Sequence, residues 1–193
     1  PATYAAALHL MRPGAAGVLG GFGGGAASPT RVTLGLHAPM ATAVADVAGA
    51  RRDYLDESGG RYVHVIADGG VGTSGDIVKA LAMGADAVML GVALARATDA
   101  PGRGFHWGPE AHHAKLPRGH RVAVDRVGPL EQILYGPAPV ADCTANLIGA
   151  LQKTMATTGY SDLKEFQRVE VAVAPCGTRR GSVVAFPTPT EQN

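Results

Sequence analysis

The stretch from residue 63 to residue 96, which reads VHVIADGGVGTSGDIVKALAMGADAVMLGVALAR, limits the possible folds more than any other part of the chain. Its first residues form an apolar, β-branched run, which predicts a buried parallel strand over 63–67. The run stops at Asp68, Gly69 and Gly70. Glycines permit positive φ angles and lack the Cβ atoms that keep a ligand away from the backbone. The strand is therefore followed by a loop that can approach a ligand closely.

A helix and a second strand come after this loop. The apolar spacing predicts a helix over 75–83, which Thr73 or Ser74 can cap and Gly84 ends. A short apolar run predicts a second buried strand over 87–91. Parallel strands that are joined by a helix end at the same edge of a sheet, so the two glycine loops are expected to lie side by side. The pattern is typical of an α/β fold.

The paired loops predict an anion site. Adjacent loops at the carboxyl edge of a (β/α) barrel commonly hold a phosphate on backbone N–H groups. A tight turn is the simpler explanation for any single glycine, but the ordered string as a whole favours a phosphate. Asp68 stands at the strand tip, where its carboxylate can accept hydrogen bonds from ribose hydroxyls or from loop amides. We favour the ribose.

This ADGG string is similar to the nucleotide site of the IMP dehydrogenase and GMP reductase family. FMN-dependent barrel oxidoreductases carry a similar string, but they lack the loop that lies upstream here. Residues 20–31, GGFGGGAASPTR, resemble the family loop GxGPGSxCTTR, which carries the catalytic cysteine. The positions that match in register are Gly21, Gly23, Gly25, Thr30 and Arg31.

The similarity extends over most of the chain, roughly from residue 8 to residue 173. Residues 38–43 resemble the family segment VPQLTA, and residues 145–152 with 155–160 resemble GGLRSSMGYTG. Within the family, the chain resembles the compact IMP dehydrogenase-related proteins of actinobacteria, which lack the regulatory CBS insert.

The resemblance implies an oxidoreductase of GMP biosynthesis that converts IMP, NAD and water to XMP and NADH in the cytoplasm. It also implies a purine nucleotide (IMP, XMP or GMP) as partner, and a homotetramer or homo-octamer at full length. The expected substrate-binding residues are Asp68, Gly69, Gly70, Gly91 and Val92, with Asp68 at the ribose. The expected catalytic positions are Ser28 and Thr30, and the expected potassium site is formed by Gly23, Gly25 and Ser28.

Three features depart from the family pattern. Ser28 replaces the cysteine whose thiolate attacks the purine ring. A thiol with a pKa of ~8.5 supplies thiolate at neutral pH, whereas a hydroxyl needs an adjacent base. No such base is evident in the sequence, and Cys143 and Cys176 lie far along the chain. Val92 replaces a phosphate-binding serine, and the segment 101–130 lacks the YRGMGS flap with its water-activating arginine.

These departures keep two other functions open. GMP reductase uses the same nucleotide pocket with NADPH, and the short flap favours it because reduction needs no activated water. A noncatalytic purine-nucleotide binder would explain the lost cysteine and the lost flap together with the retained Asp68-Gly69-Gly70. Similarity over the whole chain favours the dehydrogenase.

The histidines of the flap invite a metal interpretation, since imidazoles are common zinc ligands. His106, His112, His113 and His120 have a spacing that fits no zinc motif, and the chain has no CxxC pair. We therefore expect a solvated histidine-rich loop and no structural zinc.

Length limits how much of a barrel this chain can form. With 193 residues, 46% of them apolar and 17% charged, the chain can bury a core, but a complete (β/α)₈ barrel needs ~250 residues. Helices are expected over 4–10, 42–55, 75–83 and 146–155, and strands over 17–22, 63–67 and 87–91. By resemblance these are units about six to eight of a TIM barrel. We expect 1–175 to be the C-terminal part of a TIM-barrel catalytic domain, either as a fragment or completed by another chain, and 176–193 to be a disordered tail.

Charge and hydropathy argue against two classes of partner. The net charge is +1, and the basic residues are scattered along the chain, which gives little electrostatic support for nucleic-acid binding. No apolar run approaches the ~18 residues that a membrane span requires. We expect neither nucleic acid nor membrane as a partner.

Overall fold

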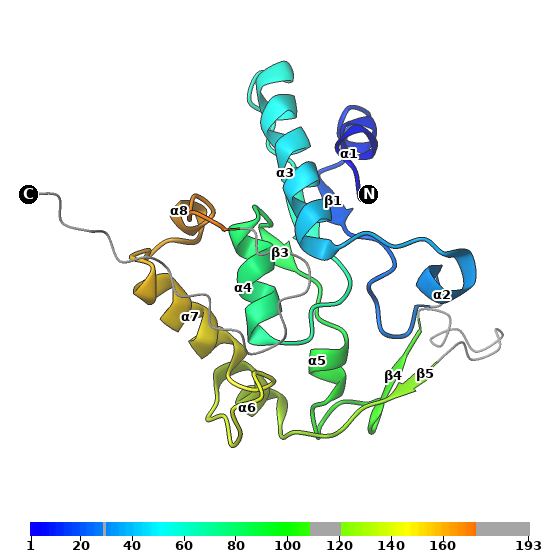
Figure 1. Cartoon of the computed structure of the whole chain (residues 1–193), viewed down its shortest axis with the longest axis vertical. Helices are drawn as coiled ribbons and strands as arrows, with labels where there is room; N and C mark the ends of the chain where they lie inside the picture. The colour runs from blue at the N-terminus through cyan, green and yellow to red at the C-terminus, as the bar shows by residue number, and fades with distance from the viewer. Residues whose placement is uncertain (29, 109–120, 173–193) are drawn as a thin grey trace, which may run out of the picture.

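The computed structural model describes residues 1–28, 30–108 and 121–172, and it shows an α/β fold (Figure 1). Its sheet has three short parallel strands in the order β1-β2-β3, which are β1 (Gly17–Gly20), β2 (His64–Ala67) and β3 (Ala87–Val88). Val18 lies opposite Val65, and Ala67 lies opposite Val88. Neighbouring strands that run in parallel must be joined by crossover connections.

Two helices make these crossovers. Helix α3 (Met40–Glu57) leads from β1 to β2, and α4 (Ser74–Ala82) leads from β2 to β3. Helix α4 begins with a capping box, in which the Thr73 hydroxyl accepts the Asp76 N–H while the Asp76 carboxylate accepts the Thr73 N–H. The cap satisfies amides that helix geometry leaves without partners, and it fixes where the loop after β2 ends.

The apolar core is divided into three clusters of buried residues, and the two larger ones involve the N-terminal and the C-terminal helices. One cluster joins α1 (Tyr4–Met11) to α3, β1 and β2, with Met11, Val47 and Val65 fully buried. A second cluster lies under α4 and the C-terminal helices, which are α5 (Val92–Ala95), α6 (Leu130–Tyr135), α7 (Leu147–Thr157) and α8 (Leu163–Phe166). In Figure 1, α7 and α8 lie to the left of α4, whereas α1 lies at the upper right. None of the helices in the described ranges is long and apolar enough to span a membrane.

A short helix and a pair of strands lie near the loops at the carboxyl ends of the parallel strands. Helix α2 (Thr30–Leu34) follows the glycine loop after β1 and buries none of its residues. Strands β4 (Phe105–Trp107) and β5 (Arg121–Ala123) pair antiparallel beside α5 (Figure 1). This hairpin occupies part of the segment in which the flap of the family is expected.

The α/β prediction is confirmed, and so are the four predicted helices, which are α1, α3, α4 and α7. The strands predicted over 17–22 and 87–91 are too long, because β1 ends at Gly20 and β3 ends at Val88. Gly21 adopts φ +137° and turns the chain out of the sheet. The remaining elements are three to six residues long and too short to give a periodic pattern; they are α2, α5, α6, α8, β4 and β5. The predicted tail, 176–193, lies outside the described residues.

A buried ionic cluster joins the opposite ends of β2 and β3 to the helices. Asp86, directly before β3, accepts hydrogen bonds from Arg51 (2.8 Å), Tyr62 (2.6 Å) and the Val65 N–H (2.8 Å). Lys164 of α8 also contacts Asp86. Burial opposes ionisation of this carboxyl, but the hydrogen bonds from Lys164, Tyr62 and Val65 and the charge of Arg51 outweigh it and lower the pKa of Asp86 to about 2. The cluster fastens α3 and α8 to the sheet.

Candidate functional site

The loops that follow β1 and β2 touch backbone against backbone. A Cβ atom on Gly24 would lie 2.9 Å from the carbonyl carbon of Gly69, and one on Gly69 would lie 3.2 Å from the Cα of Gly24. A Cβ atom on Gly21 would lie 2.1 Å from the carbonyl oxygen of Asp68. Glycine is required at this junction because any side chain would force the two loops apart.

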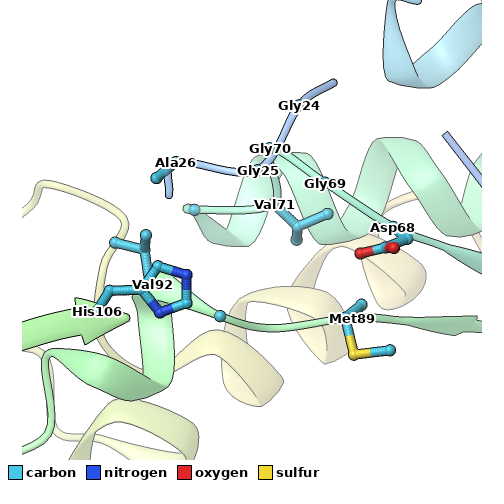
Figure 2. Close-up of a pocket in the computed structure, with 12 residues that line it drawn as sticks. Gly24, Gly25, Ala26, Asp68, Gly69, Gly70, Val71, Met89, Val92 and His106 are labelled. Carbon is cyan, nitrogen blue, oxygen red and sulfur yellow. The ribbon is translucent and has the colours of Figure 1, made fainter. Parts of the chain in front are cut away.

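The joined loops form one wall of a cavity of about 390 Å³ (Figure 2). This volume is within the range of small-molecule sites. The lining residues come from the loops after β1, β2 and β3 and from β4; they are Gly24, Gly25, Ala26, Asp68, Gly69, Gly70, Val71, Gly72, Met89, Gly91, Val92 and His106. Figure 2 shows Asp68 and His106 on opposite sides of this cavity. Among the described residues, the ionisable side chains in the lining are those of Asp68 and His106.

Asp68 is positioned by its own backbone. Its N–H donates to the Gly20 carbonyl (2.8 Å), which continues the β1–β2 pairing to the strand tip. In the described part of the chain its carboxylate forms no hydrogen bond or ion pair. The sequence allowed loop amides as alternative partners of the Asp68 carboxylate, and the structure shows no such hydrogen bond among the described residues. Its oxygens are available to a ligand with hydroxyl groups.

Backbone amides supply donors along the cavity. Among the described residues, the N–H groups of Gly70, Gly91 and Val92 donate no backbone hydrogen bond. The Gly72 N–H is already used, since it donates to Asp76 (3.3 Å). Burial raises the pKa of Asp76, but hydrogen bonds from Thr73, Lys79 and Gly72 outweigh it, so the pKa lies below its ordinary value. Asp76 therefore remains an anion that holds the loop, and three neighbouring amides remain open to an anionic ligand.

The structure brings Ser28 and Thr30 together, but not into this cavity. The Ser28 hydroxyl donates to the Thr30 hydroxyl oxygen (3.0 Å). Ser28 lines a neighbouring cavity of about 310 Å³, and Gly24, Gly25 and Ala26 line both cavities. A hydroxyl is a poor base, so this contact does not activate Ser28 as a nucleophile.

The cysteines do not compensate for the missing thiol. Cys143 is exposed and lies beside the start of α4, where its carbonyl accepts the Ser74 N–H (3.0 Å). Cys176 lies outside the described residues.

The residues of the predicted potassium site, Gly23, Gly25 and Ser28, lie in the loop after β1. Gly25 offers its carbonyl to the Ser28 N–H (3.0 Å), which uses one of the two lone pairs of that oxygen. Gly23 has φ +72° and packs against the Leu36 carbonyl. The loop thus keeps one free lone pair at Gly25, and a cation held by Gly23, Gly25 and Ser28 stays a prediction.

His106 is the site residue that sequence reasoning missed. The expectation of a solvated loop is wrong for this residue, because His106 is half-buried in β4 and lines the cavity. The pairing of β4 with β5 places it there, and no local pattern in the sequence signals that pairing. His112, His113 and His120 lie outside the described residues.

Known proteins are similar to this chain in sequence and in fold. The family described as IMP dehydrogenase / GMP reductase domain matches residues 2–124. An uncharacterized oxidoreductase of Mycobacterium tuberculosis is 53% identical over 170 residues, which are 86% of this chain and 45% of that protein. The inosine-5'-monophosphate dehydrogenase of Aquifex aeolicus is 35% identical over 184 residues, which are 86% of this chain and 36% of that protein.

The fold has a match among solved structures. The crystal structure of an IMP dehydrogenase/GMP reductase-like protein from Corynebacterium glutamicum superposes with a TM-score of 0.80 at 50% identity. The match covers 90% of this chain and 46% of that one. The chain thus spans about half the length, or less, of the proteins that it matches.

Proposed function

Because the chain belongs to the IMP dehydrogenase / GMP reductase family, we propose that it forms the nucleotide-binding part of an IMP dehydrogenase-related oxidoreductase of GMP biosynthesis. In the proposed reaction, IMP, NAD and water are converted to XMP and NADH. The observation that carries the proposal is the cavity of about 390 Å³, which is lined by Asp68 and by Gly70, Gly91 and Val92, three residues whose amides donate no backbone hydrogen bond in the described part of the chain. A nucleotide has hydroxyl donors on its ribose and acceptors on its phosphate, which match these two sets of groups.

We also propose that the chain forms the C-terminal part of a larger barrel fold. Three parallel strands with helical crossovers agree with units six to eight of a (β/α)₈ barrel, with residues 1–175 in the catalytic domain. The length of the matching proteins supports this interpretation. By relation to the family we also propose a cytoplasmic homotetramer or homo-octamer.

In the proposed complex Asp68 accepts hydrogen bonds from the ribose hydroxyls beside Gly69. The phosphate lies on the amides of Gly70, Gly91 and Val92, where the exposed backbone compensates for the hydroxyl that Val92 lacks. The purine is then held near the loop that carries Ser28 and Thr30. Binding and orientation come from groups that are in place, whereas nucleophilic attack by Ser28 needs a base that the described residues do not supply.

NAD is the hydride acceptor in this proposal. The cavity of about 390 Å³ has a volume suited to one nucleotide, and it does not by itself accommodate a dinucleotide as well.

Calorimetric titration of the full chain with IMP and GMP tests the proposal, followed by absorbance assays with NAD and NADPH. Binding of IMP with reduction of NAD supports the dehydrogenase. Binding of GMP with oxidation of NADPH supports GMP reductase, the alternative that the short flap favours. Absence of binding of either nucleotide contradicts the proposed site.

Replacing Asp68 by asparagine is expected to weaken the binding of both IMP and its nucleoside inosine, because both ligands carry the ribose. Loss of a hydrogen bond to a charged acceptor corresponds to an increase of about 10- to 100-fold in Kd. Titration calorimetry measures both affinities. Asp46→Asn is the matched control, since Asp46 is exposed on α3 and outside this cavity. An unchanged Kd for both ligands in Asp68→Asn would exclude Asp68 from the ribose site.

A noncatalytic nucleotide binder is the second candidate function, and the Ser28–Thr30 hydrogen bond (3.0 Å) favours it. If Ser28 is what prevents covalent chemistry, Ser28→Cys should react with an electrophilic halopurine nucleotide roughly tenfold or more faster than the wild type, because a thiolate forms near neutral pH. Mass spectrometry of the intact chain detects the adduct. Thr33→Cys, on the wall of the same neighbouring cavity, is the control for nonspecific alkylation. Equal rates in the two variants would contradict a nucleophile position at Ser28.

A further inference from the structure

We propose that His106 is a phosphate-binding side chain of the nucleotide cavity. The inference rests on the proposed function and adds a side chain to a subsite otherwise built from backbone amides. An imidazole can carry a positive charge and can donate from both ring nitrogens. It therefore offers a phosphate a charge-assisted hydrogen bond, which is about twice as strong as the bond from a neutral amide.

The strand pairing directs His106 into the cavity. His106 lies opposite Val122 in the antiparallel β4–β5 pair. Its neighbours Phe105 and Trp107 point to the other face of the hairpin, where the guanidinium of Arg121 stacks on both rings at 4.3 Å and 5.0 Å from the ring centres. Side chains alternate along a strand, so this stack fixes His106 on the face toward the cavity. Figure 2 shows its imidazole beside Val92.

The imidazole lies against the backbone that the phosphate is proposed to contact. A Cβ atom on Gly91 would lie 2.9 Å from Cε1 and 3.2 Å from Nε2 of His106. Only hydrogen occupies that place, so the ring packs directly on the Gly91 backbone. An anion held by the amides of Gly91 and Val92 is then within reach of the ring.

The surroundings of His106 leave its ring nitrogens available. Among the described residues, neither nitrogen takes part in a hydrogen bond or an ion pair. Asp68, the other ionisable group in the lining, lies on the opposite side of the cavity (Figure 2). The cavity thus has an acceptor side for ribose hydroxyls and a donor side for a phosphate. This polarity matches a nucleotide in one orientation.

Comparison of IMP with inosine tests the role of His106, because the two ligands differ only in the phosphate. His106→Gln is expected to increase the Kd for IMP by about 10- to 100-fold and to leave the Kd for inosine unchanged. His106→Lys keeps a cation and is expected to retain most of the IMP affinity. His9→Gln is the matched control, since His9 is exposed on α1. Trp107, the one tryptophan of the chain, follows His106 directly, and its fluorescence gives a second measure of binding.

Three results would overturn the inference. If the wild type binds IMP and His106→Gln binds it equally well, His106 is not a phosphate ligand, while the proposed function stands. If His106→Gln raises the Kd for IMP and the Kd for inosine by the same factor, and His106→Lys does the same, the residue only supports the shape of the cavity. If the wild type binds neither IMP nor GMP, the proposed function fails and the inference fails with it. Circular dichroism of each variant establishes that it is folded.

Discussion

Gly21→Ala is expected to lower the free energy of unfolding by about 4 kcal/mol. Gly21 has φ +137°, a backbone conformation that residues with a side chain rarely adopt. In addition, the new Cβ atom would lie 2.1 Å from the carbonyl oxygen of Asp68. Since backbone atoms lie on both sides of this contact, rotation of a side chain cannot relieve it, and the loops after β1 and β2 must separate. For a chain of this size the melting temperature should fall by roughly 8–16 °C.

The same substitution should abolish nucleotide binding, because Asp68 and the glycine wall move together. Gly59→Ala is the matched control. Gly59 also has a positive φ (+72°), but a Cβ atom there meets nothing within 4 Å, and the residue lies just after α3, outside the cavity lining. Its cost should be limited to about 1 kcal/mol of backbone strain. Similar melting temperatures for the two variants would show that the loop contact at Asp68 is not required.

Asp86→Ala is expected to destabilise the chain by about 3–5 kcal/mol, because it removes the carboxylate that neutralises a buried arginine. The side chains of Asp86 and Arg51 are each 9% exposed, and their ion pair is 2.8 Å long. Without Asp86, the guanidinium, the Tyr62 hydroxyl and the Val65 N–H lose an acceptor that water replaces poorly. Chemical denaturation followed by circular dichroism measures the loss.

An exposed pair provides the control for Asp86→Ala. Arg12 and Glu57 form an ion pair of 2.9 Å, with side chains that are 57% and 46% exposed. Water can solvate either partner when the other is removed, so Glu57→Ala should change stability little. If Asp86→Ala were as mild as Glu57→Ala, the buried cluster would not fasten α3 and α8 to the sheet.

Acid should weaken the same cluster. The pKa of Asp86 is lowered from 3.8 to about 2 in the folded chain, so folding favours the ionised form. This contribution, roughly 2 kcal/mol, is present in full above the unfolded pKa and is lost as the pH falls from about 4 through about 2. In Asp86→Ala this component of the pH dependence should be absent, which a comparison of the two unfolding curves against pH would detect.

Local chemistry explains why much of the fold could be predicted. The βα unit over 63–91 follows from an apolar run, a glycine turn and a helical period, all of which act over a few residues. Thr73 caps α4 as predicted, because the cap involves only residues three apart. The strand ends were less predictable, since pairing between strands decides where β1 and β3 stop. The short elements, such as α5 and β4, depend on packing rather than on periodicity.

The candidate site likewise contains some features that local sequence predicts and others that depend on packing. The strand tip with Asp68, the glycines that follow it and the helix cap could be predicted from the chain alone, because backbone conformation and capping depend on neighbouring residues. Folding was needed to show that Gly24 meets Gly69, that His106 lines the cavity, and that Lys164 contacts Asp86, 78 positions away in the sequence. It also placed Ser28 in a neighbouring cavity. These contacts join segments far apart in the chain, and they are set by how strands and helices pack, which no local pattern encodes.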